Sequence, residues 1–506
     1  MKEMRRISLA ALSILFILLS LQVSAQEAVG ESIQPKEVPQ LTGEQVSKIE
    51  TFVKKQMEKG KIPGLSLVIV NRDQLLYQKD FGFANVDRKE PVTQQTMFEL
   101  GSTSKAFTAL GILCLEAEGK LQLSDPVTKY LPWLRLKYQG KDVEIKISHL
   151  LYHTGGIPHY ETLDDIVPSE EDNALEAAVR TLVGSTTRHE PGAKFGYSSM
   201  GYNVLGLIIQ EVSGQSFEEY IKKNVLEALG LKNSVLSRKD AKGMAQGYKI
   251  GFQEPREYDA PMYRGNTPGG YIITNVEDLT RWLKIQMGTA EPAGISKELI
   301  EKSHIVNPDL PGTNYAAGWI VFKNLGIISH SGSNPNFSSF IGFSNEKVGV
   351  AVLANSNSMF TSGIGRGIGA ILRGMEPEPY NYDMNMQFDE LSSKITYVVT
   401  PFFLVALLLL LRSVLVIIGK KRRFSTGSIM KWVGAGLATL FVVGLGYVLT
   451  IVPSLLGFNV SLSFGFVWMP VSFTCAFAGI FFTFVLFYLF FLSKLFFPAE
   501  KAAAAK

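Results

Sequence analysis

The sequence predicts an α/β (α+β) fold, with an antiparallel sheet flanked by helices and an all-helical lobe, followed by a three-helix transmembrane region. Three observations support this prediction. Strand-like segments occur near both ends of residues 44–374, helix-like segments lie between them, and the last quarter of the 506 residues is apolar and nearly free of charge. A chain of at least two structural parts is therefore expected.

The N-terminus has the composition of a secretory signal peptide over residues 1–25. Basic residues precede an apolar run of about fifteen residues and the small-residue segment Val23-Ser24-Ala25. An uncleaved membrane anchor is the alternative, but the run is short for a span of about 20 residues. Both interpretations place the following chain outside the cytoplasm, after a linker over residues 26–43.

Residues 44–374 begin with a helix signal and two strand signals. Glu44–Lys59 has apolar residues at helical spacing, and "PGLSLVIV" and "QLLYQKDFGFAN" have the pattern of strands around the turn Asn71-Arg72-Asp73. A helix-rich segment from Ser102 to about Trp282 follows.

Four strand signals and a last helix signal complete this region. They are "AAGWIVF", "GIISHSG", "FSSFIGFS", "VGVAVLAN" and the helical "SGIGRGIGAILRG". Strands at both ends with helices between them predict one antiparallel sheet closed by the two ends of the domain. A functional site is expected in the cleft between this sheet and the helical lobe.

After a linker over residues 375–394, three apolar stretches within residues 395–493 are each long enough to cross a bilayer core of about 30 Å. They are Ile395–Ile418, Trp432–Val452 and Met469–Ser493. The basic segment "GKKRRFSTGSIMK" between the first two belongs on the cytoplasmic side. We therefore expect a multi-pass protein of the cytoplasmic (inner) membrane, with residues 44–374 outside and a cytoplasmic tail over residues 494–506.

The charge argues against a nucleic-acid partner, and the positions of the cysteines argue against a disulfide. The net charge of +4 comes mostly from the cytoplasmic segment and the chain ends, so nucleic acid is not expected as a partner. Cys114 and Cys475 fall in different parts of the predicted topology, so no disulfide between them is expected.

The segment "FELGSTSKAFTAL" contains the strongest candidate for a reactive side chain. Ser102 and Lys105 are three residues apart where an apolar helix begins, so their hydroxyl and amine share one helix face. The same spacing recurs at Ser344/Lys347 and Ser428/Lys431, but in a turn and a polar loop where no helix aligns the pair.

Other catalytic schemes do not match the chain. A Gly-x-Ser-x-Gly turn is absent, and residues 101–105 lack the Gly-Lys pair of a phosphate-binding loop. His149 and His153 have the spacing of zinc ligands on a helix, but no acid lies between them and Thr154-Gly155-Gly156 ends the helix. We interpret both histidines as structural and expect neither a metal nor another cofactor.

A serine without a histidine base needs another group to remove its proton. Lysine can do so only when neutral, which requires burial or nearby cations to lower its pKa from about 10.4. A tyrosine phenolate needs stabilising cations instead. A Ser/Lys/Tyr cluster meets both needs by sharing one proton within hydrogen-bond reach.

Three motifs resemble those of the serine β-lactamase and penicillin-binding protein superfamily, in particular its class C-like branch. The first two, Ser-x-x-Lys and Tyr-x-Asn, correspond to Ser102–Lys105 and Tyr197-Ser198-Ser199, and the third, Lys-Thr-Gly or His-x-Gly, to His330-Ser331-Gly332. The flanks "ISHLLYHTGGIP" and "PGGYIITNVEDLTRWL" are also similar. The resemblance covers about residues 45–373 and implies a β-lactamase-like fold.

The resemblance also implies roles for individual residues. Ser102 would be the acylated nucleophile, Lys105 and Tyr197 the groups that move protons, and His330 the third-motif side chain. The backbone N–H groups of Ser102 and Ser333 would form the oxyanion hole. The residues expected to contact substrate are Ser199, Gly332 and Asn334.

Two positions depart from the family pattern. Ser199 replaces the usual asparagine, so a hydroxyl substitutes for only part of its amide contacts. His330 stands where β-lactamases have lysine, and a histidine with a pKa near 6.5 is mostly uncharged at neutral pH. Tyr197 then lacks a permanent cation that would favour its phenolate, which weakens the case for efficient β-lactam hydrolysis. The His-x-Gly motif favours the esterase, D-aminopeptidase or amidase members, where it is common.

The order of parts is similar to that of membrane-bound D-amino-acid prodrug peptidases of the colibactin-maturation type. We expect a membrane-anchored extracytoplasmic serine peptidase or amidase that acts through an acyl-enzyme on N-acyl-D-amino-acid, D-peptide or peptidoglycan-like substrates. The alternatives are a penicillin-binding D-Ala-D-Ala carboxypeptidase or class C-like β-lactamase or esterase, and a non-turnover β-lactam or cell-wall sensor. The expected partners are the lipid bilayer and an acylated-peptide or cell-wall substrate, and the membrane helices leave open a homo-oligomer or a transporter partner.

Overall fold

A computed structural model describes residues 40–455 and 460–498. The predicted signal peptide, most of the linker after it and most of the predicted tail lie outside these residues. We call residues 44–374 the globular domain.

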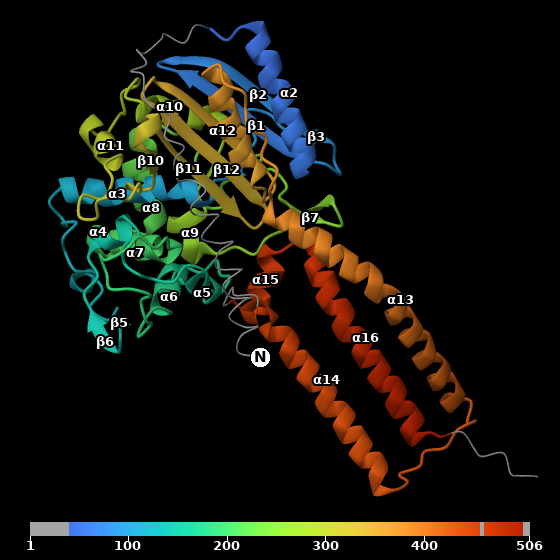
Figure 1. The fold of residues 1–506 in the computed structure, drawn as a ribbon. Helices are drawn as coiled ribbons and strands as arrows, with labels where there is room; N and C mark the ends of the chain where they lie inside the picture. The colour runs from blue at the N-terminus through green and yellow to red at the C-terminus, as the bar shows by residue number, and fades with distance from the viewer. Residues whose placement is uncertain (1–39, 456–459, 499–506) are drawn as a thin grey trace, which may run out of the picture. The chain divides into compact units, whose positions relative to one another are not determined.

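A seven-stranded antiparallel sheet forms the centre of the globular domain, in the order β10-β11-β12-β13-β1-β2-β3 (Figure 1). The strands are β1 (Gly64–Asn71), β2 (Gln74–Asn85), β3 (Glu90–Pro91), β10 (Ile320–Phe322), β11 (Ile327–Asn334), β12 (Phe337–Ser344) and β13 (Val348–Ala354). The first strand pairs with the last, Leu65 opposite Ala354. This pairing confirms that the two ends of the domain close one sheet.

The alternation of side chains along β1 divides the apolar core in two. Leu65, Leu67 and Ile69 pack in a cluster with α2 (Gly43–Gly60) and α12 (Phe360–Leu372). Val68 and Val70 belong to the larger cluster on the opposite face. Successive side chains of a strand point to opposite faces, so both faces of the sheet are covered.

Helices between β2 and β10 form the lobe that covers this second face. They are α3 (Lys105–Ala117), α4 (Ile147–Leu151), α5 (Tyr160–Asp164), α6 (Ala174–Arg180), α7 (Ser199–Ser213), α8 (Phe217–Ile221), α9 (Thr267–Gly270), α10 (Val276–Gln286) and α11 (Lys297–Ser303). Short 3-10 turns are η1 (Gly101–Ser104), η2 (Val127–Lys129), η4 (Arg264–Asn266) and η5 (Lys323–Leu325), and η3 (Lys222–Glu227) is a π-helical segment that continues α8. Short strand pairs are β4 (Phe98–Glu99) with β9 (Ile273–Thr274), β5 (Leu136–Tyr138) with β6 (Lys141–Val143), and β7 (Tyr248–Gly251) with β8 (Glu254–Glu257).

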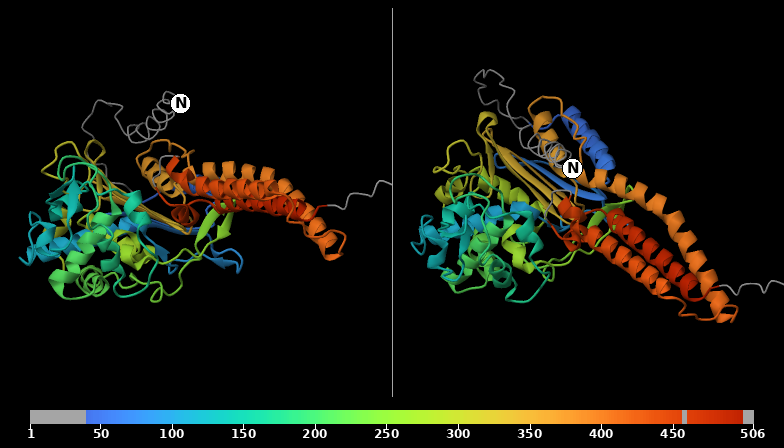
Figure 2. Two further views of the ribbon diagram at one scale, coloured as in Figure 1. Left: turned by 90° about the horizontal axis from the view of Figure 1, so that it is seen from below. Right: turned by 60° about the horizontal axis from the view of Figure 1, so that its bottom comes forward.

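The C-terminal region contains the helices α13 (Met384–Ile418), α14 (Ile429–Leu455), α15 (Leu462–Trp468) and α16 (Val471–Phe496). Three of them have segments long and apolar enough to cross a membrane, with mean hydropathies of 2.7, 2.2 and 2.4. The helix α16 packs along both α13 and α14, and Figure 2 shows the three helices side by side in one bundle. Their exposed apolar surfaces support membrane association.

The predicted linker over residues 375–394 is in part helical, because α13 begins at Met384, well before the predicted Ile395. Asp383 caps this helix by accepting a hydrogen bond from the backbone N–H of Asn385 (2.9 Å). The first turns of α13 are polar where they contact the globular domain. A polar composition is also typical of a linker, which is why the sequence predicts one here. The short helix α15 was not predicted from the sequence.

Candidate active site

Ser102 lies in the single turn η1, between β4 and α3. The turn begins at Gly101, whose φ is +56°, and a Cβ atom there would lie 2.3 Å from the backbone N of Ser333. Only glycine allows the turn to approach β11 this closely. The two backbone N–H groups predicted to form an oxyanion hole therefore come from adjoining segments.

Lys105 begins α3, and its side chain is fully buried. Its Nζ lies 3.0 Å from Ser102 Oγ, 3.0 Å from Ser199 Oγ and 2.6 Å from the carbonyl oxygen of Gly269. Burial lowers the pKa of the Lys105 amine to about 7. The i, i+3 spacing predicted from the sequence therefore does bring the amine to the hydroxyl.

The three oxygen neighbours of Lys105 satisfy either protonation state. An ammonium would donate a hydrogen bond to each of them. A neutral amine would donate to Gly269 and Ser199 and accept the proton of the Ser102 hydroxyl. The second arrangement directs the amine lone pair toward the Ser102 proton, as a general base requires.

Tyr197 precedes α7 and comes close to this pair. Lys105 Nζ lies 5.1 Å from the centre of the Tyr197 ring. The Tyr197 hydroxyl is buried and makes no hydrogen bond of good geometry within residues 40–455 and 460–498. Burial raises the pKa of the Tyr197 phenol, and the Ser102 and Ser199 hydroxyls offset part of the rise. The phenol is therefore protonated at neutral pH.

His330 lies on β11 and is 5% exposed. Its Nδ1 lies 2.7 Å from the carbonyl oxygen of Ser331, and its Nε2 lies 3.3 Å from the Tyr315 hydroxyl. A carbonyl only accepts, so Nδ1 carries the proton and Nε2 accepts from Tyr315. Burial, assisted by the nearby Lys105 amine, lowers the pKa of His330 to about 4.

Three aromatic residues beside Tyr197 were not predicted as site residues. The ring centres of His153, His159 and Tyr315 lie 4.2, 5.2 and 6.2 Å from that of Tyr197. His153 Nδ1 accepts the N–H of Ser198, and His159 Nδ1 accepts the N–H of Ser199. Burial keeps the pKa of His153 well below its usual value and lowers that of His159 to about 3. Both neutral rings fix the backbone that carries Tyr197.

A sequence signal for His153 and His159 does exist. Both lie at the edges of the segment "HTGGIPH", which follows the short helix α4, and a glycine-rich segment between helices is a common place for site residues. Tyr315 carries no such signal, because its position depends on how the chain before β10 packs.

The three residues predicted to contact substrate are already engaged in contacts within the domain. Ser199 Oγ is bound to Lys105, and a Cβ at Gly332 would lie 1.8 Å from the carbonyl oxygen of Leu100. The Asn334 amide donates to the Glu99 carboxylate (2.6 Å) and to the carbonyl oxygen of Gly270 (3.0 Å) and is 2% exposed. Substrate contact by these residues stays a prediction, and for Asn334 the buried amide does not favour it.

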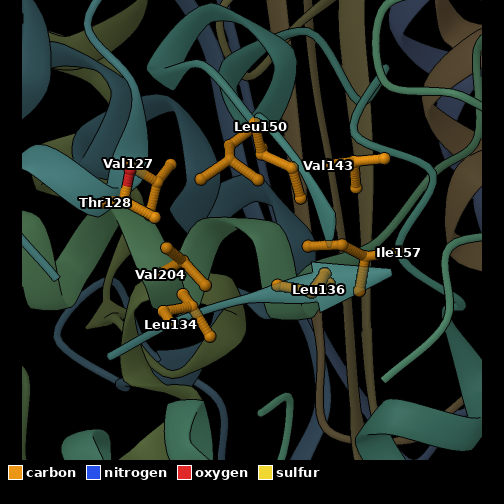
Figure 3. Close-up of a pocket in the computed structure, with 9 residues that line it drawn as sticks. Val127, Thr128, Leu134, Leu136, Val143, Leu150, Ile157 and Val204 are labelled. Carbon is orange, nitrogen blue, oxygen red and sulfur yellow. The ribbon is translucent and has the colours of Figure 1, made fainter. Parts of the chain in front are cut away.

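Two features lie apart from this cluster. His149 accepts a hydrogen bond from the backbone N–H of Lys146, and in the described part of the chain no group of three or more His, Cys, Asp or Glu side chains is placed to hold a metal ion. A cavity of about 10 Å³, enough for one water, lies in the helical lobe (Figure 3). Its lining is almost entirely aliphatic and carries no titratable side chain, so it is not the reaction site.

Comparison with known proteins decides the family. The model of the β-lactamase family matches residues 49–369. The chain belongs to the β-lactamase family. This family of serine hydrolases is consistent with the Ser102, Lys105 and Tyr197 cluster described above.

Relatives and solved structures agree with this assignment. Protein flp of Staphylococcus aureus (strain MW2) is 36% identical over 63% of this chain, which spans 65% of that relative's length. Protein flp of strain COL is 30% identical over 85% of this chain and 87% of the relative, a match that extends beyond residues 49–369.

Among solved structures, the octameric penicillin-binding protein homologue from Pyrococcus abyssi is 34% identical, with a TM-score of 0.58 over 66% of this chain and 78% of that one. A class C β-lactamase, 23% identical, has a TM-score of 0.55 over 64% of this chain and 95% of its own, which shows a shared fold.

Proposed function

We propose that this β-lactamase-family member is a membrane-anchored extracytoplasmic serine hydrolase, a peptidase or amidase that acts through an acyl-enzyme on N-acyl-D-amino-acid, D-peptide or peptidoglycan-like substrates. The observation that carries the proposal is the buried Lys105 amine, 3.0 Å from the Ser102 hydroxyl, with a pKa of about 7. An amine with this pKa is partly neutral at physiological pH and can take up the serine proton.

Acylation begins when Lys105 Nζ takes the proton of Ser102 and Oγ forms a bond to the substrate carbonyl carbon. The carbonyl electrons move to oxygen, and the N–H groups of Ser102 and Ser333 stabilise that oxyanion. The bond to the leaving nitrogen then breaks, and Tyr197 donates its proton to that nitrogen. The proton held by Lys105 replaces the one that Tyr197 has lost.

Deacylation reverses the roles of the same groups. A water molecule attacks the acyl carbon while the neutral Lys105 amine, directly or through Tyr197, removes its proton. The bond between the acyl carbon and Ser102 Oγ breaks, and Oγ recovers the proton from Lys105. No cation other than Lys105 is needed for these steps.

The neutral His330 supports an amide or ester substrate over a β-lactam. A lysine at this position would offer a permanent charge to the carboxylate of a β-lactam, whereas His330 has a pKa of about 4 and is already hydrogen-bonded to Tyr315. Its two ring nitrogens are occupied, so it supports the strand rather than binding an anion.

The proposed function is tested by incubating membranes that contain the full chain with a panel of N-acyl-D- and L-amino-acid amides, depsipeptides and penicillins. The Ser102→Ala variant is the blank, and Ser344→Ala, which alters a second Ser-x-x-Lys sequence in the β12–β13 turn, is the matched control. We expect turnover of D-configured amides by the native chain and by Ser344→Ala and none by Ser102→Ala.

The same panel separates the alternatives. Release of D-alanine from a stem peptide would identify a carboxypeptidase, and rapid penicillin hydrolysis would identify a β-lactamase. Stable labelling by a fluorescent penicillin without turnover of any substrate would identify a sensor. Turnover retained by Ser102→Ala would reject the serine mechanism altogether.

A further inference from the structure

The strand that carries Ser333 is tied to the loop after β13 by one short hydrogen bond. The Ser333 hydroxyl donates to Asn357 Oδ1 at 2.7 Å. Ser333 is exposed on β11 and Asn357 is half-buried, so the bond lies at the rim of the domain, beside the backbone N–H predicted for the oxyanion hole.

The loop that carries Asn357 is in turn fixed by the first candidate membrane helix. Asp383, the N-cap of α13, is 4% exposed and accepts hydrogen bonds from the Ser358 hydroxyl (3.0 Å) and the Met359 N–H (2.8 Å). A weaker bond of 3.4 Å joins the Asn385 amide to the carbonyl oxygen of Asn357. Both residues that follow Asn357 are thus bound to the start of α13.

The start of α13 is itself anchored by a buried polar contact. Asp389 is fully buried, and its carboxylate accepts the N–H groups of Phe252 (2.8 Å) and Gln253 (2.7 Å) in the β7–β8 turn. The Ser472 hydroxyl of α16 donates to the same carboxylate at 2.6 Å. Three short hydrogen bonds to one buried carboxylate are strong, because charge-assisted bonds gain in a low dielectric.

The β7–β8 hairpin is also connected to the turn that follows β11, at the same end of the strand as Ser333. Lys249 Nζ donates to the carbonyl oxygens of Phe466 (3.0 Å) and Val467 (2.9 Å) at the end of α15. The Asn336 amide, in the turn after β11, donates to the carbonyl oxygen of Tyr258 (2.8 Å) just after the hairpin. The end of β11 that carries Ser333 is therefore linked to two segments that both contact the C-terminal helices.

We propose that α13 positions the oxyanion-hole N–H of Ser333 through Asn357, which makes Asn357 a positioning residue for the reaction. This inference rests on the proposed function of Ser102. An oxyanion donor contributes to the rate only when it lies at hydrogen-bond distance from the developing charge, so a small shift of β11 lowers kcat. The C-terminal helices would then be part of the catalytic geometry rather than a passive anchor.

The experiment uses the full chain purified in detergent and the amide substrate that it turns over. Asn357→Ala removes the acceptor, Asn357→Asp keeps an acceptor oxygen, and Ser333→Ala removes the donor hydroxyl but keeps the N–H. Asn381→Ala is the matched control, because Asn381 is an exposed residue before α13 that accepts a hydrogen bond from Lys59.

We expect Asn357→Ala and Ser333→Ala each to lower kcat by about 10- to 100-fold with little change in KM, since losing an oxyanion donor outright costs about 10²- to 10³-fold. Asn357→Asp should retain most of kcat, and Asn381→Ala all of it. Because the two alanine variants break the same bond, the double variant should be no slower than either.

The link to α13 is tested by Asp383→Ala. We expect it to lower kcat in the native background and to have no further effect in Asn357→Ala. Native kcat in Asn357→Ala or Ser333→Ala, additive losses in the double variant, or equal loss in Asn357→Asp would overturn the inference. Ser333 is exposed, so Ser333→Ala remains informative if Asn357→Ala does not fold.

The Ser102→Ala variant distinguishes a failure of this inference from a failure of the proposed function. Turnover that persists in Ser102→Ala would reject the proposed function whatever Asn357 does. Turnover that is lost in Ser102→Ala but native in Asn357→Ala and Ser333→Ala would reject only the role of Asn357.

Discussion

The Tyr315 hydroxyl lies 3.3 Å from His330 Nε2, and this contact completes the hydrogen bonding of the neutral third-motif side chain. Tyr315 donates to Nε2 while Nδ1 donates to the Ser331 carbonyl, so both ring nitrogens are used in the neutral form. Burial, assisted by the Lys105 amine, lowers the pKa of His330 to about 4, so the imidazole is uncharged at neutral pH.

The acid limb of the pH–rate profile should therefore belong to Lys105 and not to His330. We expect kcat/KM to rise with pH through a pKa near 7, as the Lys105 ammonium loses its proton. His330→Gln should leave the position of this limb unchanged even if it lowers the rate. A limb that disappears in His330→Gln would show that the histidine is the titrating group.

The buried Lys105 should also make stability depend on pH. Its pKa is about 7 in the folded chain and about 10.4 when unfolded, so between these values the unfolded chain binds a proton that the folded chain lacks. Stability therefore rises with pH from about 7 to 10.4, and below pH 7 the burial penalty is complete.

Lys105→Met should remove the part of this dependence that belongs to Lys105 and raise the melting temperature at pH 7. A rise with pH should remain from Lys249, because burial also lowers its pKa to about 7. The measurement is thermal unfolding in detergent between pH 7 and pH 10, with Lys120→Met as the control because Lys120 is exposed. A melting temperature of Lys105→Met that equals the native value at pH 7 would contradict the burial penalty.

The orientation of the membrane region is testable with introduced cysteines. In a background of Cys114→Ala and Cys475→Ala, Asp73→Cys places a thiol on an exposed turn of the globular domain and Ser428→Cys places one in the basic segment. In intact cells, a membrane-impermeant maleimide should label the first and not the second. The reverse labelling pattern would invert the proposed topology.

The contact between Asp389 and the β7–β8 turn should contribute to stability. Asp389→Ala leaves the N–H groups of Phe252 and Gln253 and the Ser472 hydroxyl without their acceptor. The loss costs about 1–3 kcal/mol for the buried Ser472 hydroxyl and less for the two N–H groups of the partly exposed turn. We expect a lower melting temperature in detergent than for Asp240→Ala, a change at an exposed site. Equal melting temperatures would mean that the turn does not depend on α13.

The Ser102 and Lys105 pair could be predicted because its geometry is local. A separation of three residues at a helix start places the two side chains together, and the apolar run after Lys105 indicates that helix. The sheet closed by both ends of the domain could also be predicted, because strand patterns occur at each end. These features depend on the order of residues along the chain.

Features set by tertiary packing could not be predicted in this way. His153 has a φ of +56° at the end of α4, and only the fold brings its ring within 4.2 Å of Tyr197. The first turns of α13, which begins at Met384, are held by Asp389, and its carboxylate binds a turn more than a hundred residues earlier in the chain. Polar residues of this kind are typical of a linker until their partners are known.

The contact of the β7–β8 hairpin with the C-terminal helices has a practical consequence for recombinant production. A water-soluble fragment that ends at residue 374 would leave Lys249 without the carbonyl oxygens of Phe466 and Val467 and would lose Asp389 altogether. Its hairpin would expose a surface shaped for a helix bundle. Crystallisation or ligand screening of such a fragment would therefore examine the site without the contacts that the C-terminal helices make with the hairpin.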